Sequence, residues 1–198
     1  MNVLFLGPPD SPVLDFLKST EAGVVQTMDP LDATFFARHP VDFLVSHGYR
    51  HIIKPYVLDR FPRRAVNLHI SYLPWNRGAD PNLWSFIENT PKGVSIHYLD
   101  AGIDTGDLIT QRMVQFAEGE TLGTSYARLQ SEIGQLFQEH WRQIREGTCS
   151  ATKQIGTGSF HRAADREKVS HLRTNGWDTP VAQLEKAGGE WRKGHKPA

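Results

Sequence analysis

The sequence predicts an α/β fold, an open and mostly parallel β-sheet flanked by helices. Short apolar runs recur between residues 2 and 116 in the manner of buried strands. Segments with helix-start signals alternate with the first four runs. This alternation is typical of parallel strands connected by helical crossovers. A long amphipathic segment over residues 121–147 then supplies a helix to cover the sheet.

Four apolar runs are expected to form the strands of the first half. These runs are residues 2–6, 24–25, 42–46 and 65–70. Ser11 and Pro12 have the residue types of an N-cap and a first helical position, so a helix is expected to begin there. Short helices are also expected over residues 31–38 and over residues 55–61, the second beginning at a proline.

The second half shows two further strand patterns and the longest helix. Residues 93–99 alternate apolar and polar side chains, which predicts a half-exposed strand, and residues 107–116 are expected to form another. Apolar side chains then recur at three- and four-residue steps over residues 121–147. One long helix is therefore expected, with Gly147 as its C-cap.

The composition changes after this helix. Residues 151–198 hold nine Lys and Arg against five Asp and Glu, a local net charge of +4, and few aliphatic side chains. We therefore expect two domains, residues 1–147 and a short C-terminal extension over residues 148–198. The last stretch, residues 188–198, is expected to be poorly ordered and flexible.

The whole composition is that of an ordinary globular chain. Its 198 residues suffice for one good core, and 39 % of them are hydrophobic. Lys plus Arg equals Asp plus Glu at 22 each, so no global field favours nucleic acid or an anionic membrane. The single Cys149 excludes an internal disulfide framework. No apolar run approaches the roughly 20 residues of a membrane span, and no signal-peptide pattern is present, so the cytoplasm is the expected location.

Two polar residues stand at the end of the strand over residues 65–70. Residues i and i+2 of a strand face the same side, so Asn67 and His69 are expected to project together. Ligands bind at the carboxyl ends of strands in open α/β sheets, and an amide beside an imidazole can hold an oxyanion and move a proton. The alternative is that both side chains merely cap neighbouring backbone.

A cluster of aspartates over residues 100–107 permits two interpretations. The stretch lacks the calcium-loop pattern and contains no paired-histidine zinc signature, so no metal is expected. Turn chemistry is the preferred interpretation for Asp100 and Asp107. Asp104 differs if it lies over His69, because a carboxylate there would favour the protonated, oxyanion-stabilising imidazole.

Taken together, these motifs resemble the folate-dependent formyltransferase family. That family includes glycinamide ribonucleotide transformylase, methionyl-tRNA formyltransferase and the nucleotide-sugar N-formyltransferases. The resemblance covers about residues 40–145, and its three elements occur in order at family-like spacing. They are NLHISYLP with RG (67–74 and 77–78), GVSIH (93–97) and DTG (104–106).

The resemblance implies a Rossmann-like sheet, N10-formyltetrahydrofolate as co-substrate, and transfer of a formyl group to an amine through a tetrahedral intermediate without a metal. Asn67, His69 and Asp104 match the family's catalytic trio. Two segments match those around the folate pocket, and the residues chosen there are Gly48, Tyr49, His51, Ile52, Leu99 and Ile103.

The chain also departs from the family pattern. Tyr72 stands where leucine is usual and Ile70 where proline is common. Fewer residues than usual precede Asn67, so the N-terminal half of the sheet is expected to be abbreviated. Gly7 is followed by two prolines rather than by a dinucleotide fingerprint, so NAD is not indicated.

The acceptor is expected to be a small-molecule amine, and specifically a nucleotide-linked amino-sugar. Residues 158–165 resemble a stretch of some nucleotide-sugar N-formyltransferases, and the modest charge of the tail does not favour nucleic acid. Trp75, Arg77 and His161 are the expected substrate-binding residues. His161, with Arg162 and Trp177, either contacts a diphosphate or base or fastens the tail to the core. Trp84 is expected to be a core residue.

Several alternatives stay open at this point. The acceptor could be of the glycinamide ribonucleotide or methionyl-tRNA type, or the trio could send the formyl group to water, as a hydrolase would. A non-catalytic folate- or sugar-binding module is a further alternative. The oligomeric state is also open, with a homodimer among the alternatives.

Overall fold

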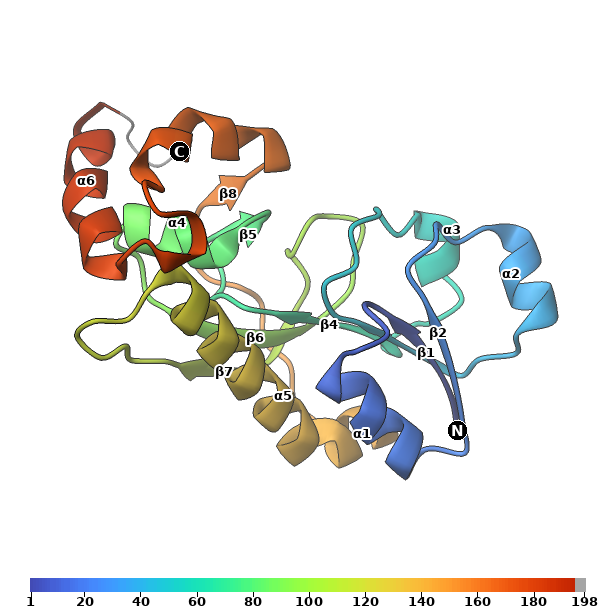
Figure 1. Cartoon of the computed structure of the whole chain (residues 1–198). Coiled ribbons are helices and arrows are strands. Elements are labelled where there is room, and N and C mark those ends of the chain that lie inside the picture. Colours follow the sequence, from blue (N-terminus) through green and yellow to red (C-terminus); the bar gives the residue numbers. More distant parts are fainter. Residues whose placement is uncertain (195–198) are drawn as a thin grey trace. The chain divides into compact units, whose positions relative to one another are not determined.

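The computed structural model describes residues 1–194 and contains a six-stranded sheet in the order β2-β1-β3-β4-β6-β7 (Figure 1). β1 pairs in parallel with β2 and with β3, and β3 pairs in parallel with β4. The mostly parallel sheet flanked by helices is therefore confirmed. Its strands are β1 (Asn2–Leu6), β2 (Gly23–Thr27), β3 (Phe43–Ser46), β4 (Ala65–His69), β6 (Gly93–Tyr98) and β7 (Leu108–Met113).

Helices connect these strands and complete the chain. They are α1 (Pro12–Thr20), α2 (Ala33–Arg38), α3 (Pro55–Leu58), α4 (Pro81–Ile87), α5 (Leu122–Glu146) and α6 (Val181–Gly194), with 3₁₀ helices η1 (Ala163–Leu172) and η2 (Gly176–Asp178). A separate two-stranded pair joins β5 (Arg77–Gly78) to β8 (Phe160–His161). None of the helices within residues 1–194 has the length and apolar character needed to cross a membrane.

The chain divides into two compact units. The first comprises Met1–His69, Ile96–Thr110 and Gly134–Lys153, and the second comprises Ile70–Ser95, Gln111–Ile133 and the residues from Gln154 onwards. This division differs from the predicted split between residues 147 and 148. The tail contributes to the core of the second unit, as described below, rather than forming an appendage of its own.

The first unit is built around strands that are buried on both faces. Leu4, Leu6 and Leu44 form a core cluster with residues of α2, α3 and the start of β4. The predicted start of α1 is confirmed, because the Ser11 side chain accepts a hydrogen bond from the amide of Val13. α1 lies beside the second half of α5, as Figure 1 shows.

β6 is buried along its whole length, so the predicted half-exposed strand is wrong. The polar side chains that produced the alternation bond inside the protein rather than face water. Ser95 donates to the carbonyl oxygen of Ser71 at 2.6 Å and accepts from the amide of Leu73 at 3.1 Å. These internal hydrogen bonds replace the ones that water would otherwise form with the hydroxyl group, so Ser95 can be buried.

The second unit has a core that joins α4, the start of α5 and the tail. Trp84, Ile87, Leu122, Val169 and Leu184 are among its buried residues, and α6 lies beside α4 in Figure 1. Neither α4 nor α6 was among the helices expected from the sequence.

The stretch expected to be poorly ordered, residues 188–198, is described in part. Residues 188–194 form the end of α6, and the rest of that stretch, residues 195–198, lies outside the described residues. Trp191 explains this, since it packs against the core cluster of the second unit and anchors the last turns.

Candidate active site

Two side chains stand at the carboxyl end of β4. Asn67 and His69 occupy alternate positions of this strand, and His69 is only 7 % exposed. Val66 and Leu68, on the opposite alternation, are buried and fix the strand in the sheet. The polar pair is therefore held on a rigid element at the edge where ligands bind in open α/β sheets.

Asp104 lies in the loop after β6, and its backbone is left-handed with a φ of +53°. Aspartate tolerates this region because its short side chain can bond locally. The loop folds back closely at Gly106, where a Cβ atom would overlap the carbonyl oxygen of Tyr98. The local sequence thus favours a tight turn that aims one carboxylate at the end of β4.

The two neighbouring aspartates have partners other than the trio. Asp100 accepts hydrogen bonds from the amide of Gly102 at 3.0 Å and from the hydroxyl of Thr105 at 2.8 Å. Asp107 forms an ion pair with Lys153, whose ammonium lies 2.8 Å away. The contacts of Asp100 agree with its turn interpretation, whereas Asp107 is engaged in an ion pair with a residue far along the chain.

Asp104 brings the predicted trio together. Its Oδ1 atom accepts a hydrogen bond from Asn67 Nδ2 at 3.0 Å, and its Oδ2 atom lies 3.6 Å from His69 Nδ1. The Asp104 side chain is 12 % exposed, so water screens these contacts weakly. The carboxylate therefore contacts the two partners through separate oxygens.

A fourth side chain, His97 of β6, completes the cluster, although no role for it was expected from the sequence. Its Nε2 atom lies 3.3 Å from Asn67 Nδ2 and 3.4 Å from Asp104 Oδ1, while its Nδ1 atom lies 2.8 Å from the carbonyl oxygen of Tyr98. Because a carbonyl only accepts, Nδ1 carries a proton that it donates to Tyr98, while Nε2 faces both Asn67 and Asp104. The sequence signal that could have identified His97 is its place near the end of a second predicted strand.

This arrangement is suited to the transfer of an acyl-type group. Asn67 supplies amide N–H donors of fixed direction, which stabilise negative charge developing on a carbonyl oxygen. His69 is an imidazole held in one orientation by a carboxylate, which suits it to donate or relay a proton. All four residues belong to the first unit.

The predicted folate-binding residues lie on two loops of the same unit. Gly48, Tyr49, His51 and Ile52 follow β3, and Leu99 and Ile103 follow β6. Tyr49 donates its hydroxyl to the carbonyl oxygen of Asp29 at 2.7 Å, and burial raises the pKa of Tyr49, so the hydroxyl stays a donor. Tyr49 and Leu99 pack against the same core cluster, which fastens both loops to one support.

The same loops also present apolar side chains to solvent. Ile52 is 76 % exposed and Ile103 is 45 % exposed, so both side chains are accessible to a ligand. His51 contacts the ring of Tyr49 edge-on, with ring centroids 5.3 Å apart. Gly48 turns the chain at the end of β3 with a φ of +74°.

Two of the predicted substrate-binding residues, Arg77 and His161, lie in the second unit and make internal contacts there. An Arg77 Nη atom donates to the carbonyl oxygen of Thr157 at 2.8 Å. His161 stacks on the buried ring of Trp84 with centroids 3.8 Å apart, and its Nε2 atom lies 3.0 Å from Glu88 Oε1. These contacts fasten the tail to the core, the alternative that the sequence analysis left open for His161.

Trp75, the third predicted substrate-binding residue, lines a hollow of about 180 Å³ in the second unit. Trp191 and Arg192 of α6 line the same hollow. The expected core role of Trp84 fits its complete burial. Among residues 1–194, no group of three or more His, Cys, Asp and Glu side chains is arranged to hold a metal.

Residues 11–140 match the model of the formyl transferase family, which is well over half of the chain. The chain belongs to the formyl transferase family. The family predicted from the three sequence motifs is therefore confirmed. Asn67, His69, His97 and Asp104 all lie within the matched residues of this family member.

A closely similar solved structure is that of the formyltransferase PseJ from Anoxybacillus kamchatkensis, in complex with UDP-4,6-dideoxy-4-formamido-L-AltNAc and tetrahydrofolate. It is 52 % identical, with a TM-score of 0.89, over 94 % of this chain and 100 % of that chain. Both proteins therefore share this fold along nearly the whole of their length.

Two curated relatives are more distant. The dTDP-4-amino-4,6-dideoxyglucose formyltransferase of Mycobacterium bovis is 32 % identical over 137 residues, covering 66 % of this chain and 58 % of the relative. A methionyl-tRNA formyltransferase of Agathobacter rectalis is 26 % identical over 163 residues, covering 82 % of this chain and 52 % of the relative. This formyl transferase thus spans little more than half the length of these curated relatives.

Proposed function

We propose that the protein transfers a formyl group from N10-formyltetrahydrofolate to the primary amine of a nucleotide-linked amino-sugar. The observation that carries the proposal is the contact of Asp104 with both Asn67 and His69. The identity of 52 % to PseJ, a formyltransferase solved with a UDP-linked formamido sugar and tetrahydrofolate, supports the choice of both substrates.

The proposed reaction assigns one task to each side chain. The neutral amine attacks the formyl carbon, and negative charge develops on the formyl oxygen in a tetrahedral intermediate. An N–H of Asn67 and protonated His69 donate to this oxygen. The bond between the formyl carbon and N10 then breaks, and Asp104 helps to relay the proton from the amine to the departing tetrahydrofolate nitrogen.

The folate is proposed to lie against the loops after β3 and β6. Exposed Ile52 and Ile103 would cover its rings, and the backbone around Gly48 would lie along its edge. No metal takes part in the proposal. The cytoplasm is the proposed location, and a small-molecule amine, rather than nucleic acid or a membrane, is the proposed partner. A homodimer is the proposed assembly. Sedimentation at two protein concentrations tests the assembly.

The test follows tetrahydrofolate formation from N10-formyltetrahydrofolate with and without UDP- and dTDP-amino-sugars. Wild type is compared with Asn67→Ala, and with Gln138→Ala as a control that removes an amide from an exposed position of α5. We expect turnover that depends on the amine, that falls about 10²- to 10³-fold in Asn67→Ala, and that is unchanged in the control.

Other outcomes overturn parts of the proposal. Formate release without any amine would make the protein a hydrolase. Turnover with glycinamide ribonucleotide or methionyl-tRNA, but not with an amino-sugar, would replace the acceptor class. Folate binding without turnover on any of these amines would leave a binding module as the better interpretation.

A further inference from the structure

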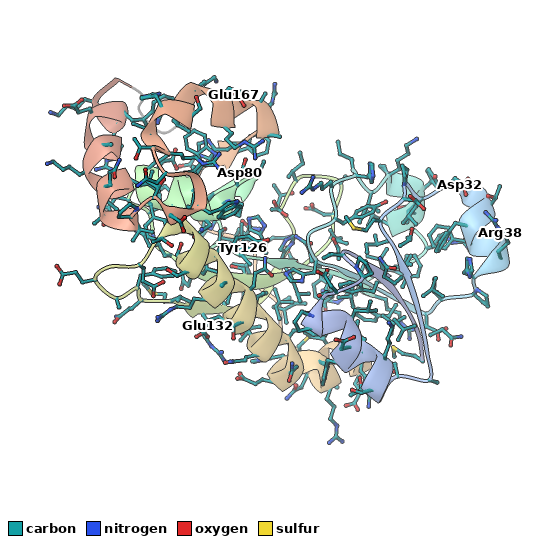
Figure 2. All side chains as sticks on the ribbon, in the orientation of Figure 1. Asp32, Arg38, Asp80, Tyr126, Glu132 and Glu167 are labelled. Carbon is teal, nitrogen blue, oxygen red and sulfur yellow. The ribbon has the colours of Figure 1, made fainter. Side chains whose placement is uncertain are left out.

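A hollow in the second unit brings two aromatic rings and two arginines together. It measures about 60 Å³, and the residues that matter for its chemistry are Asp80, Tyr126, Arg166, Arg173 and Trp177. Asp80 stands at the N-cap position of α4 and Tyr126 lies in the second turn of α5; Figure 2 labels both. The other three come from the tail, whose role the sequence analysis left open.

The two rings form an exposed aromatic surface. Trp177 is 55 % exposed and Tyr126 is 39 % exposed, and their ring centroids lie 5.3 Å apart. Each ring is large, so their joint exposure leaves a considerable apolar surface in water. A planar group that stacks on this surface would bury it, and nucleic-acid bases stack on such rings whatever their sequence.

The backbone holds this surface in a fixed position. The amide of Leu122 donates to the carbonyl oxygen of Thr179 at 2.9 Å, and the amide of Val181 donates to the carbonyl oxygen of Glu120 at 3.0 Å. Gly123 permits the close approach, because a Cβ atom there would press on the carbonyl oxygen of Trp177. The Trp177 segment is thus fastened to the start of α5, which lowers the entropy lost on binding.

The arginines of the hollow are suited to an anion. The Nε atom of Arg173 is buried and has no hydrogen-bond partner, an unfavourable state that an accepting ligand atom would relieve. Arg166 lies 3.7 Å from the Asp80 carboxylate, which positions its guanidinium beside the hollow. These three groups carry a net charge of +1. Arginine presents several N–H donors in one plane, the geometry that phosphate oxygens accept.

We propose that this hollow binds the nucleoside diphosphate portion of the acceptor substrate. The base stacks on Trp177 and Tyr126, phosphate oxygens accept from Arg173 and Arg166, and Asp80 accepts from a ribose hydroxyl. At about 60 Å³ the hollow takes one phosphate-sized group, and the base lies over the exposed rings. The inference rests on the proposed function, since it names the part of the protein that recognises the nucleotide of that substrate.

The test measures binding of UDP, uridine and inorganic pyrophosphate to the full chain by titration calorimetry, without folate or amine. The variants are Trp177→Ala, Arg173→Gln and Arg173→Lys. Arg142→Gln, which changes an exposed arginine of α5 in the same way, is the matched control. Thermal melting of each variant confirms that it is folded.

We expect the dissociation constant of UDP to rise about ten-fold or more in Trp177→Ala and in Arg173→Gln, with partial recovery in Arg173→Lys and no change in Arg142→Gln. Uridine should be sensitive to the tryptophan change alone, and pyrophosphate to the arginine change alone. With an active amino-sugar substrate, its KM should rise in both variants while the KM for the formyl donor stays constant.

Unchanged UDP binding in both folded variants would overturn the inference while leaving the proposed function intact. The opposite result, UDP binding that the variants weaken in a protein without formyl transfer, would overturn the function and keep the nucleotide site. If UDP does not bind the wild type at millimolar concentration, the hollow is not a nucleotide site.

Discussion

Asp104 is the side chain on which the geometry of the candidate active site depends, because its two oxygens contact three partners. We predict that Asp104→Asn lowers kcat by about 10²-fold or more, since a neutral amide cannot orient His69 by charge. The substitution keeps the size of the side chain and tolerates the left-handed backbone. KM for both substrates should change little, and steady-state kinetics with a thermal melt as control would show it. A kcat within about three-fold of wild type would remove Asp104 from the mechanism.

Gly106 determines whether the loop can place Asp104 at all. We predict that Gly106→Ala destabilises the protein by about 1–3 kcal/mol, because the new methyl group overlaps the carbonyl oxygen of Tyr98. Gly134→Ala is the matched control: it lies within α5 with nothing near its missing Cβ atom, so it should stabilise the helix by up to about 1 kcal/mol. Urea unfolding of both variants measures the difference, and equal stabilities would contradict the tight approach.

Among single residues, the sequence identified those whose type and spacing carry chemistry and missed those whose role depends on a neighbour. Asn67 and His69 could be paired because strand alternation places them on one face. His97 could not, since its contact with Asn67 depends on which strands pair. Arg77 and His161 show the converse, because their residue types suit a ligand while the fold gives both of them internal partners.

At the scale of elements, Glu21 ties the end of α1 to the second half of α5. Its Oε1 atom accepts hydrogen bonds from Trp141 Nε1 and from an Arg145 Nη atom, each at 2.7 Å. Burial alone would raise the pKa of Glu21, but these hydrogen bonds outweigh it and hold the pKa below its ordinary value. A carboxyl group with a lowered folded pKa stabilises the fold above its unfolded pKa and loses that contribution as pH falls.

We therefore predict that Glu21→Gln lowers the free energy of unfolding by about 1–2 kcal/mol near neutral pH. The difference from wild type should stay constant above about pH 5 and shrink as the pH falls below about 4.3, where the unfolded carboxyl protonates. Chemical unfolding at a series of pH values tests it. A difference that grows toward acid pH would contradict the sign of the shift.

Helices with a strong periodic pattern or a clear N-cap were predictable from the sequence, and a short helix without a polar face was not. α1 and α5 follow from the Ser11 cap and from the three- and four-residue apolar steps. α4 escaped because it has seven residues and is buried on nearly all sides, so no polar face marks it as amphipathic. β6 was given the right place but the wrong exposure, because Ser95 and His97 bond internally.

On the scale of the whole molecule, the tail is part of a core rather than an extension. We predict that Leu184→Ala costs about 2–5 kcal/mol, because the side chain is completely buried among residues of α4 and α5. Ile155→Ala in the same tail removes a side chain that is 88 % exposed and should cost less than about 0.5 kcal/mol. Urea unfolding compares the two, and similar values would show that the tail does not contribute to stability.

The organisation of the chain was the least predictable feature. A boundary after residue 147 follows from the change in composition, yet packing assigns residues 70–95 and 111–133 to the same unit as the tail. The tail's buried residues, Val169, Val181 and Leu184, are separated by polar stretches, so no local pattern marks them as core. Only the three-dimensional arrangement shows that they cover Trp84 and Ile87.

The core that joins Leu83 to Leu184 has a consequence for synthesis of the protein on the ribosome. About a hundred further residues are synthesised after α4 before α6, the helix that covers its apolar face, emerges from the ribosome. At translation rates of about 5–20 residues per second, that interval lasts roughly 5–20 seconds. During this time the nascent chain presents a cluster of large apolar side chains, Trp84 among them, of the kind that chaperones bind.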